Sequence, residues 1–166
     1  RLFGGSLADL ARVRWAFPEA ILLRKDFLLD EYMLAESRAY GADLALLMVS
    51  VLGDRTADMV GLARKHRIEP LVEVRDEEEL SIGARAGARL IGINNRDLAT
   101  LDVDLSTSER LLPLVPEGAI PVVESGISGP EQVTRFHRMG ARLFLVGESL
   151  VGSRDPADTI RRYVGK

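Results

Sequence analysis

The sequence contains no cysteine, and this absence removes several kinds of chemistry. Without thiols there is no disulfide, no thiolate metal site and no cysteine nucleophile. No stretch approaches the roughly 18 uncharged apolar residues that a membrane span needs. The first residues mix Arg, Asp and Gly, whereas a secretory signal is basic and then apolar. We therefore expect a soluble, cytoplasmic protein that binds no membrane.

An excess of one charge sign is also absent. The 22 Lys and Arg residues nearly balance the 25 Asp and Glu residues, and their dispersal argues against a nucleic-acid groove. His66 and His137 lie in polar helical stretches, where surface positions are expected, and no cluster has metal-ligand spacing. No Gly-x-Gly-x-x-Gly follows an expected strand, which weighs against a dinucleotide-binding fold.

The residues that are present predict an ordinary globular protein. The chain has 166 residues, 46% of them hydrophobic and 28% charged, which suits a single domain over residues 1–166. It opens at Arg1 instead of methionine, so we expect the numbering to begin inside a longer protein.

Three segments resemble one another, namely 40–49, 86–94 and 139–147. Each places Gly-Ala and a charged residue after a helical pattern and then continues into a short apolar run. Gly suits the left-handed position just past a helix, and an unbroken apolar run suits a buried strand of a parallel sheet. Three further apolar runs occupy 21–23, 70–74 and 120–123. The chain therefore predicts six strands.

Helical patterns fill the gaps between these runs, and another covers 6–16, where Trp15 and Phe17 are expected to pack a helix onto the sheet. Helix starts are expected at Asp155-Pro156 and at three pairs spaced like capping boxes, namely Asp76 with Glu79, Ser106 with Glu109, and Ser128 with Glu131. Strict strand–helix alternation predicts an α/β fold with a parallel sheet. Both an open doubly wound sheet and six strands of an eight-stranded (βα)8 barrel fit this order.

Polar residues gather where the predicted strands end. The active sites of parallel α/β proteins lie beyond the carboxyl ends of the strands. Five of the six ends carry such residues, namely Arg24, Lys25 and Asp26; Glu73; Asn94, Asn95 and Arg96; Glu124 and Ser125; and Gly147, Glu148 and Ser149.

Each of these residues alone has an ordinary structural explanation as an ion pair or a helix cap. Glu73 lies between apolar residues, so it predicts either a salt bridge to Lys25 or Arg24 or a catalytic role. The joint placement of Lys25, Glu73 and Glu124 favours general acid–base catalysis, although spacing alone does not assign the acid and the base. Gly126 and Gly147 predict either tight turns or close approach of the backbone to a phosphate.

The motifs as a set resemble indole-3-glycerol phosphate synthase. The matching segments are Phe3-Gly-Gly-Ser6, Leu23-Arg-Lys-Asp-Phe27, Leu71-Val-Glu-Val74, Ile91-Gly-Ile-Asn-Asn-Arg-Asp-Leu98, Val123-Glu-Ser-Gly-Ile127 and Val146-Gly-Glu-Ser-Leu150. The resemblance implies a TIM barrel of which strands three to eight are present. It also implies a carboxy-lyase of tryptophan biosynthesis that closes the indole ring of 1-(2-carboxyphenylamino)-1-deoxyribulose 5-phosphate and releases CO2 and water. No cofactor or metal is implied.

The resemblance also implies roles for individual residues. Lys25 matches the general acid, and Glu73 matches a catalytic carboxylate of the dehydration. The substrate-binding matches are Asn94 and Glu124, Arg96 near the anthranilate carboxylate, and the apolar walls Phe3, Phe27 and Leu98. The phosphate-binding matches are Ser125, Gly126, Gly147 and Glu148, the last through its backbone N–H.

One departure from the family bears on activity. The family carries a catalytic Glu and Lys on its first strand, and no segment of this sequence matches that strand. We therefore expect the 166 residues alone to be inactive. The alternative hypothesis is a non-catalytic partial barrel that binds phosphorylated ligands or self-associates through open strand edges. Phosphoribosylanthranilate isomerase is a rival enzyme, which the Leu23–Phe27 motif does not favour.

Overall fold

The computed structural model describes residues 5–165, and these fall into two compact units. The first comprises residues up to 73 together with 82–89, and the second comprises 74–81 together with 90–165. Helices and strands alternate in both units, so the α/β fold class is confirmed. The prediction of a single domain stays a prediction, and so does that of an eight-stranded barrel. Among the described helices, none is long and apolar enough to cross a membrane.

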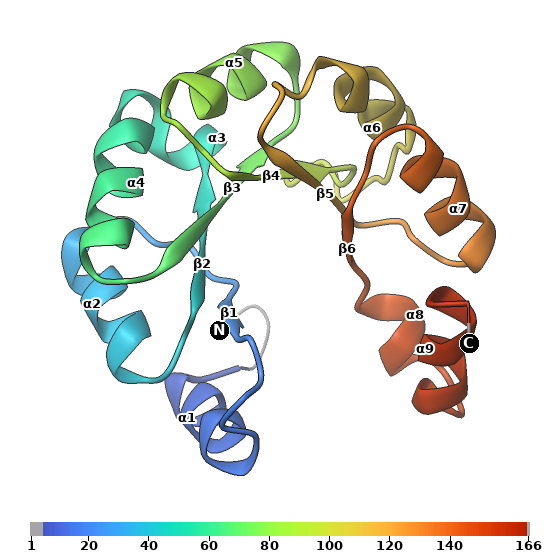
Figure 1. Ribbon diagram of the computed structural model, residues 1–166, viewed down its shortest axis with the longest axis horizontal. Helices are drawn as coiled ribbons and strands as arrows, with labels where there is room; N and C mark the ends of the chain where they lie inside the picture. The colour runs from blue at the N-terminus through green and yellow to red at the C-terminus, as the bar shows by residue number, and fades with distance from the viewer. Residues whose placement is uncertain (1–4, 166) are drawn as a thin grey trace. The chain divides into compact units, whose positions relative to one another are not determined.

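The first unit contains three parallel strands in the order β1-β2-β3. The α2 and α4 helices lie on one side of these strands (Figure 1). Its elements are α1 (Leu7–Ala16), β1 (Leu23–Arg24), α2 (Glu31–Ala39), β2 (Leu44–Met48), α3 (Val49–Leu52), the 3₁₀ turn η1 (Gly53–Arg55), α4 (Thr56–Lys65) and β3 (Glu69–Val74), whose last residue belongs to the second unit.

The second unit contains three parallel strands in the order β4-β5-β6. The α6 and α7 helices lie on one side of them (Figure 1). Its elements are β4 (Leu90–Asn94), α6 (Ser106–Leu111), the 3₁₀ turn η2 (Leu112–Leu114), β5 (Ile120–Glu124), α7 (Pro130–Arg138), β6 (Leu143–Leu145), α8 (Glu148–Val151) and α9 (Pro156–Tyr163). The helix α5 (Glu77–Arg85) has residues in both units.

Burial on both faces explains why apolar and polar residues do not alternate along these strands. In β4 all five residues are buried, and in β2 and β3 every residue after the first is buried. Apolar residues on both faces of these strands are removed from water, which stabilises the fold by about 25 cal/mol for each Å² of apolar surface. The six predicted runs are therefore confirmed as strands, with boundaries shifted by up to two residues in β1.

The structure confirms some of the predicted helix caps and contradicts others. At α9 the prediction is confirmed, because Asp155 accepts a hydrogen bond from Asp158 N and Pro156 occupies the first turn. The capping box at Ser106 is wrong, because Asp104 accepts from Ser106 N. The one at Ser128 is also wrong: α7 begins at Pro130, and Ser128 N donates to Gln132 instead of Glu131. At α5 half of the predicted capping box is present. The Asp76 carboxylate accepts a hydrogen bond from Glu79 N, as expected, but the Glu79 carboxylate accepts from Arg75 N instead of Asp76 N.

The expected packing of Trp15 and Phe17 is wrong as well. Their exposed fractions are 86% and 64%, and α1 buries none of its residues. The helix is held instead through Arg14, whose guanidinium donates to the Gly41 carbonyl and pairs with Asp43. Polar contacts thus dock a helix for which apolar packing was expected.

Candidate functional site

Lys25 and Glu73 form an ion pair in the first unit. Lys25 follows the last residue of β1, and Glu73 is the penultimate residue of β3, opposite Met48 in the register. The Lys25 Nζ donates to Glu73 Oε2 at 3.1 Å. The Glu73 side chain is only 3% exposed, whereas that of Lys25 is 46% exposed. A buried carboxylate therefore holds a half-exposed ammonium that solvent or a ligand can reach.

The same contact answers which basic residue Glu73 pairs with. Lys25 and Arg24 were both candidates, and the ion pair forms with Lys25. Arg24 points away to α2, where its guanidinium contacts Glu36 and Ser37. The salt bridge to Lys25 is the structural expectation for Glu73, and it also places a charged proton donor beside a buried carboxylate, an arrangement that acid–base catalysis can use.

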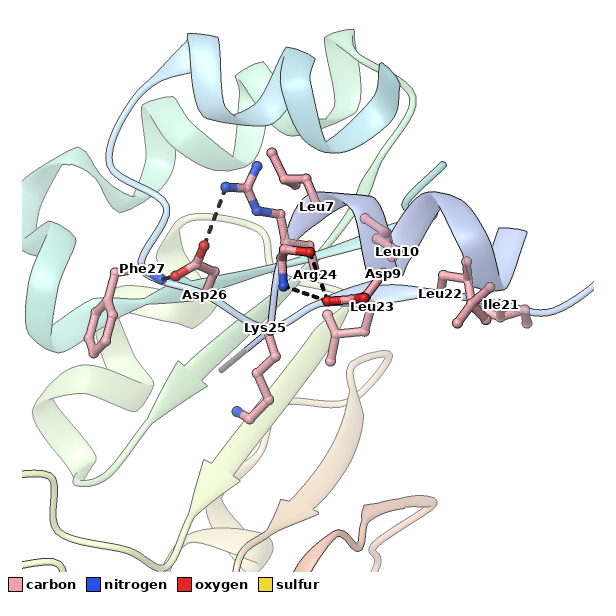
Figure 2. Close-up of a pocket in the computed structure, with 13 residues that line it drawn as sticks. Leu7, Asp9, Leu10, Ile21, Leu22, Leu23, Arg24, Lys25, Asp26 and Phe27 are labelled. Atoms are coloured by element: carbon pink, nitrogen blue, oxygen red, sulfur yellow. Dashed lines mark hydrogen bonds and ion pairs between the residues drawn. The ribbon is translucent and has the colours of Figure 1, made fainter. Parts of the chain in front are cut away.

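A cavity of about 570 Å³ lies beside this pair, between α1 and the segment 21–27. Its volume lies within the range of small-molecule sites. Lys25 and Phe27 contribute to its wall, and Figure 2 shows Lys25 extending away from Arg24. Glu73 does not line it. The cavity therefore adjoins the Lys25 side of the pair rather than enclosing both groups.

In the second unit, Asn94 and Glu124 end neighbouring strands and stand opposite one another in the register. Both are buried. The Asn94 Oδ1 accepts hydrogen bonds from Ser125 Oγ at 2.8 Å and from Arg96 N at 3.0 Å. The predicted substrate-binding amide is therefore fixed in orientation by two of its predicted neighbours, Ser125 and Arg96.

Arg96 joins the loop after β4 to the start of α8. Its guanidinium donates to the Leu101 carbonyl at 2.9 Å and to Glu148 Oε2 at 3.0 Å. The Glu148 side chain is almost fully exposed, so this pair is accessible to solvent. Leu98 lies in the same loop and is partly exposed, as an apolar wall requires. The structure thus brings Asn94, Arg96 and Glu148 into one chain of contacts.

Sequence reasoning missed Asp97, which organises this loop. Its Oδ1 accepts from Ala99 N at 2.7 Å and from Thr100 N at 3.1 Å, and Leu101 adopts a left-handed φ of 66° in the turn that follows. Aspartate followed by small or polar residues is a turn signal that could have revealed it. These two backbone N–H donors hold the pKa of the Asp97 carboxyl below its ordinary value.

The lowered pKa of Asp97 predicts how the loop responds to acid. Its contribution to loop stability is complete above the pKa of the unfolded chain and is lost as pH falls through the lower folded pKa. We expect the Thr100 amide resonance to shift with this titration in NMR spectra. Asp97→Asn keeps the acceptor oxygen and should remove the pH dependence. A Thr100 amide that shifts equally in both proteins would contradict the assignment.

Gly126 and Gly147 differ in why glycine stands there. Gly126 has a φ of 80°, and a Cβ atom there would lie 2.5 Å from Val103 Cγ1, so the turn itself requires glycine. Gly147 has a φ of −115°, and nothing lies within 4 Å of a Cβ built on it. The tight-turn explanation therefore holds for Gly126 and does not account for Gly147.

Phe3, a predicted apolar wall, lies outside the described residues. Within residues 5–165, no group of three or more His, Cys, Asp or Glu side chains could hold a metal ion. The remaining predicted site residues lie at or just beyond the carboxyl ends of β1, β3, β4, β5 and β6, within one unit or the other.

The family model described as indole-3-glycerol phosphate synthase matches residues 1–163. The chain is similar to an indole-3-glycerol phosphate synthase of Nocardioides sp., at 49% identity over 99% of this chain and 64% of that relative. It is 48% identical to that of Streptomyces griseus, over 99% of this chain and 61% of that relative. The chain thus spans less than two thirds of these relatives.

Solved structures with the same fold are more distant in sequence. 3-Hexulose-6-phosphate synthase from Salmonella typhimurium aligns with a TM-score of 0.82 at 16% identity, over 96% of this chain and 78% of that chain. A mutant tryptophan synthase alpha-subunit from Pyrococcus furiosus aligns with a TM-score of 0.75 at 17% identity, over 98% and 75% respectively. These likenesses show a shared fold.

Proposed function

The chain belongs to the indole-3-glycerol phosphate synthase family, and from this premise we propose that the whole protein that carries it closes the indole ring. The substrate is 1-(2-carboxyphenylamino)-1-deoxyribulose 5-phosphate, and the reaction releases CO2 and water. The observation that carries the proposal is the contact between Lys25 and the buried Glu73. It supplies a charged proton donor next to a carboxylate, as the reaction requires.

The chemistry assigns a step to each member of this pair. The aromatic carbon that bears the carboxylate attacks the substrate carbonyl, and the Lys25 ammonium gives its proton to the carbonyl oxygen as that bond forms. Loss of CO2 returns the bonding electrons to the ring. The new hydroxyl then accepts a second proton and leaves as water, and the neighbouring carbon, which is bonded to nitrogen, gives up a proton so that the double bond of the indole forms. Glu73 is the carboxylate of this dehydration, and its role as acid or base stays open.

The second unit supplies groups for binding. Arg96 is assigned to the carboxylate of the anthranilate ring, because a guanidinium matches a carboxylate with parallel N–H donors. Asn94 and Glu124 are assigned to positioning the sugar chain. Leu98, Phe27 and Phe3 are each assigned to an apolar wall against the aromatic ring, as the family resemblance implies. The fixed orientation of the Asn94 amide supports its share of this assignment.

The phosphate is assigned to the backbone of Ser125, Gly126, Gly147 and Glu148. Ser125 and Gly126 have left-handed φ angles of 63° and 80°, so the chain turns sharply directly after β5, where the phosphate is assigned. The open space in front of Gly147 supports close approach of an anion there. Glu148 is assigned through its N–H, since its carboxylate faces Arg96.

The proposal also covers the complete fold of the whole protein and its location in the cell. The alternation of strands and helices supports an eight-stranded (βα)8 barrel in the whole protein. A cytoplasmic location and self-association through strand edges stay predictions.

The proposal is tested by incubating the whole protein with this substrate and following indole absorbance and released CO2. Equal formation of indole-3-glycerol phosphate and CO2 is the expected result. Phosphoribosylanthranilate serves as the control substrate and should be left unchanged. Isomerisation of the control without ring closure of the first substrate would contradict the proposal and favour the rival isomerase.

A further inference from the structure

Arg24 is the most deeply buried arginine side chain near Lys25, and the proposed reaction gives it no role. It ends β1, its side chain is 9% exposed, and its Nη1 donates to three acceptors on α2. These are Met33 O at 3.1 Å, Glu36 Oε2 at 2.9 Å and Ser37 Oγ at 3.1 Å. A guanidinium is always charged, so its burial is tolerated only with such partners. Arg24 therefore fixes the end of β1 to α2.

Asp26 extends this attachment past Lys25. Its Oδ2 accepts from Arg24 Nη2 at 3.3 Å, and its Oδ1 accepts from the backbone N–H of Phe27 at 2.9 Å. One carboxylate thus connects the docked guanidinium to the chain on the far side of Lys25. Lys25 is flanked on both sides by residues of a single network.

The segment that carries Lys25 has little regular secondary structure to hold it in place. The strand β1 has two residues, its ladder with β2 ends at the pair Arg24 and Ala45, and α2 begins only at Glu31. Beyond Arg24 the ladder does not continue, and the chain bends at Asp26. Figure 2 shows Arg24 and Asp26 turned toward one another while Lys25 extends the other way. Holding Arg24 and Asp26 on one side therefore directs Lys25 to the other.

We infer that Arg24 and Asp26 are positioning residues that hold the Lys25 ammonium against Glu73 for proton donation. The inference rests on the proposed function, because it concerns the acid of that reaction. A lysine side chain has four rotatable bonds, and that of Lys25 is half exposed, so packing alone does not fix its Nζ. Misplacement of a reacting group by about 1 Å costs up to roughly 10²-fold in rate.

The test compares Asp26→Ala with Asp26→Asn in the whole protein. Asp26→Ala removes both contacts and is expected to lower kcat by roughly 10- to 10²-fold with little change in KM. Asp26→Asn retains an acceptor for Phe27 N and should recover part of the loss. Since Asp26 is half exposed, both variants are expected to fold, whereas loss of Arg24 leaves buried partners unpaired.

Thr56→Val is the matched control for a purely structural effect. It removes the hydrogen bond from Thr56 Oγ1 to Gly53 O, at a buried position at the start of α4. It should weaken the fold without changing kcat of the folded enzyme. A parental kcat in Asp26→Ala, or an equal fall in Thr56→Val, would overturn the inference.

A structural measurement separates failure of the inference from failure of the proposed function. In crystals of Asp26→Ala, the Lys25 Nζ should lie beyond hydrogen-bond distance of Glu73 Oε2. Crystals of the parent should show the hydrogen bond from Lys25 Nζ to Glu73 Oε2, which is 3.1 Å long in this structure. An unchanged contact in the variant would overturn the inference even if the parent did not turn over the substrate.

Discussion

Replacing Lys25 with methionine is expected to lower kcat for indole ring closure by about 10²- to 10⁴-fold, the usual contribution of a positioned general acid. Methionine keeps the length and apolar stem of the side chain but removes the ammonium that donates to Glu73. Glu73→Gln should have a loss of similar size, because glutamine keeps the shape of the side chain and removes its charge. Steady-state kinetics on the whole protein measure both effects.

The double variant tests whether the two residues act together. Groups that act as a unit give strongly non-additive losses, so the double variant should be about as slow as the slower single variant. Lys65→Met is the matched control, because Lys65 forms an ion pair with Glu31 at 2.8 Å on the exposed surface of the same unit. Its kcat should equal that of the parent. Independent, multiplying losses in the double variant would contradict a shared role.

The largest expected effect on stability is at Asn95, which is 2% exposed. Its Nδ2 donates to Glu124 O at 3.0 Å and to Ser125 O at 3.1 Å, and its Oδ1 accepts from Ser108 N at 3.0 Å. The side chain thereby fastens the end of β5 and the first turn of α6 to the end of β4. Asn95→Ala leaves the Ser108 N–H and the two carbonyls without this partner. The free energy of unfolding should fall by about 2–4 kcal/mol.

Urea denaturation measures the effect of Asn95→Ala, and two variants isolate its cause. Asn95→Asp keeps the acceptor for Ser108 N but turns a carboxylate toward two carbonyl oxygens, so it should destabilise the protein as much as alanine does. Ser106→Ala removes an exposed hydroxyl that contacts Asp104 and should change stability by no more than about 0.5 kcal/mol. Equal effects of Asn95→Ala and Ser106→Ala would contradict the role assigned to Asn95.

Strand positions and strand-end residues could be predicted because they depend on local patterns. Unbroken apolar runs suit strands that are buried on both faces of a parallel sheet, so β2 and β4 follow from the order of apolar residues along the chain. A cation partner for Glu73 could be expected because a lone carboxylate in an apolar strand needs one, but only the fold selected Lys25 over Arg24. The family motifs added the reaction, which spacing and burial alone did not specify.

Other features could not be predicted, for two different reasons. At Ser106 and Ser128 a second acceptor close in sequence, Asp104 or Gln132, competed with the expected cap, and the sequence pattern does not rank the two acceptors. Elsewhere, side chains distant in sequence decide the contact. Arg24 looked like an ordinary strand-end charge, and its role depends on acceptors nine to thirteen residues away on α2. Asn95 likewise connects residues that only the fold brings together.

The most direct test of the central claim is the release of CO2 from 1-(2-carboxyphenylamino)-1-deoxyribulose 5-phosphate by the whole protein and by its Lys25→Met variant. The claim is that this chain carries the acid and the carboxylate of indole ring closure in the Lys25–Glu73 pair. It predicts CO2 release in step with indole formation by the parent, and a loss of about 10²-fold or more in the variant. Equal rates in the two proteins, or no release by the parent, would contradict it.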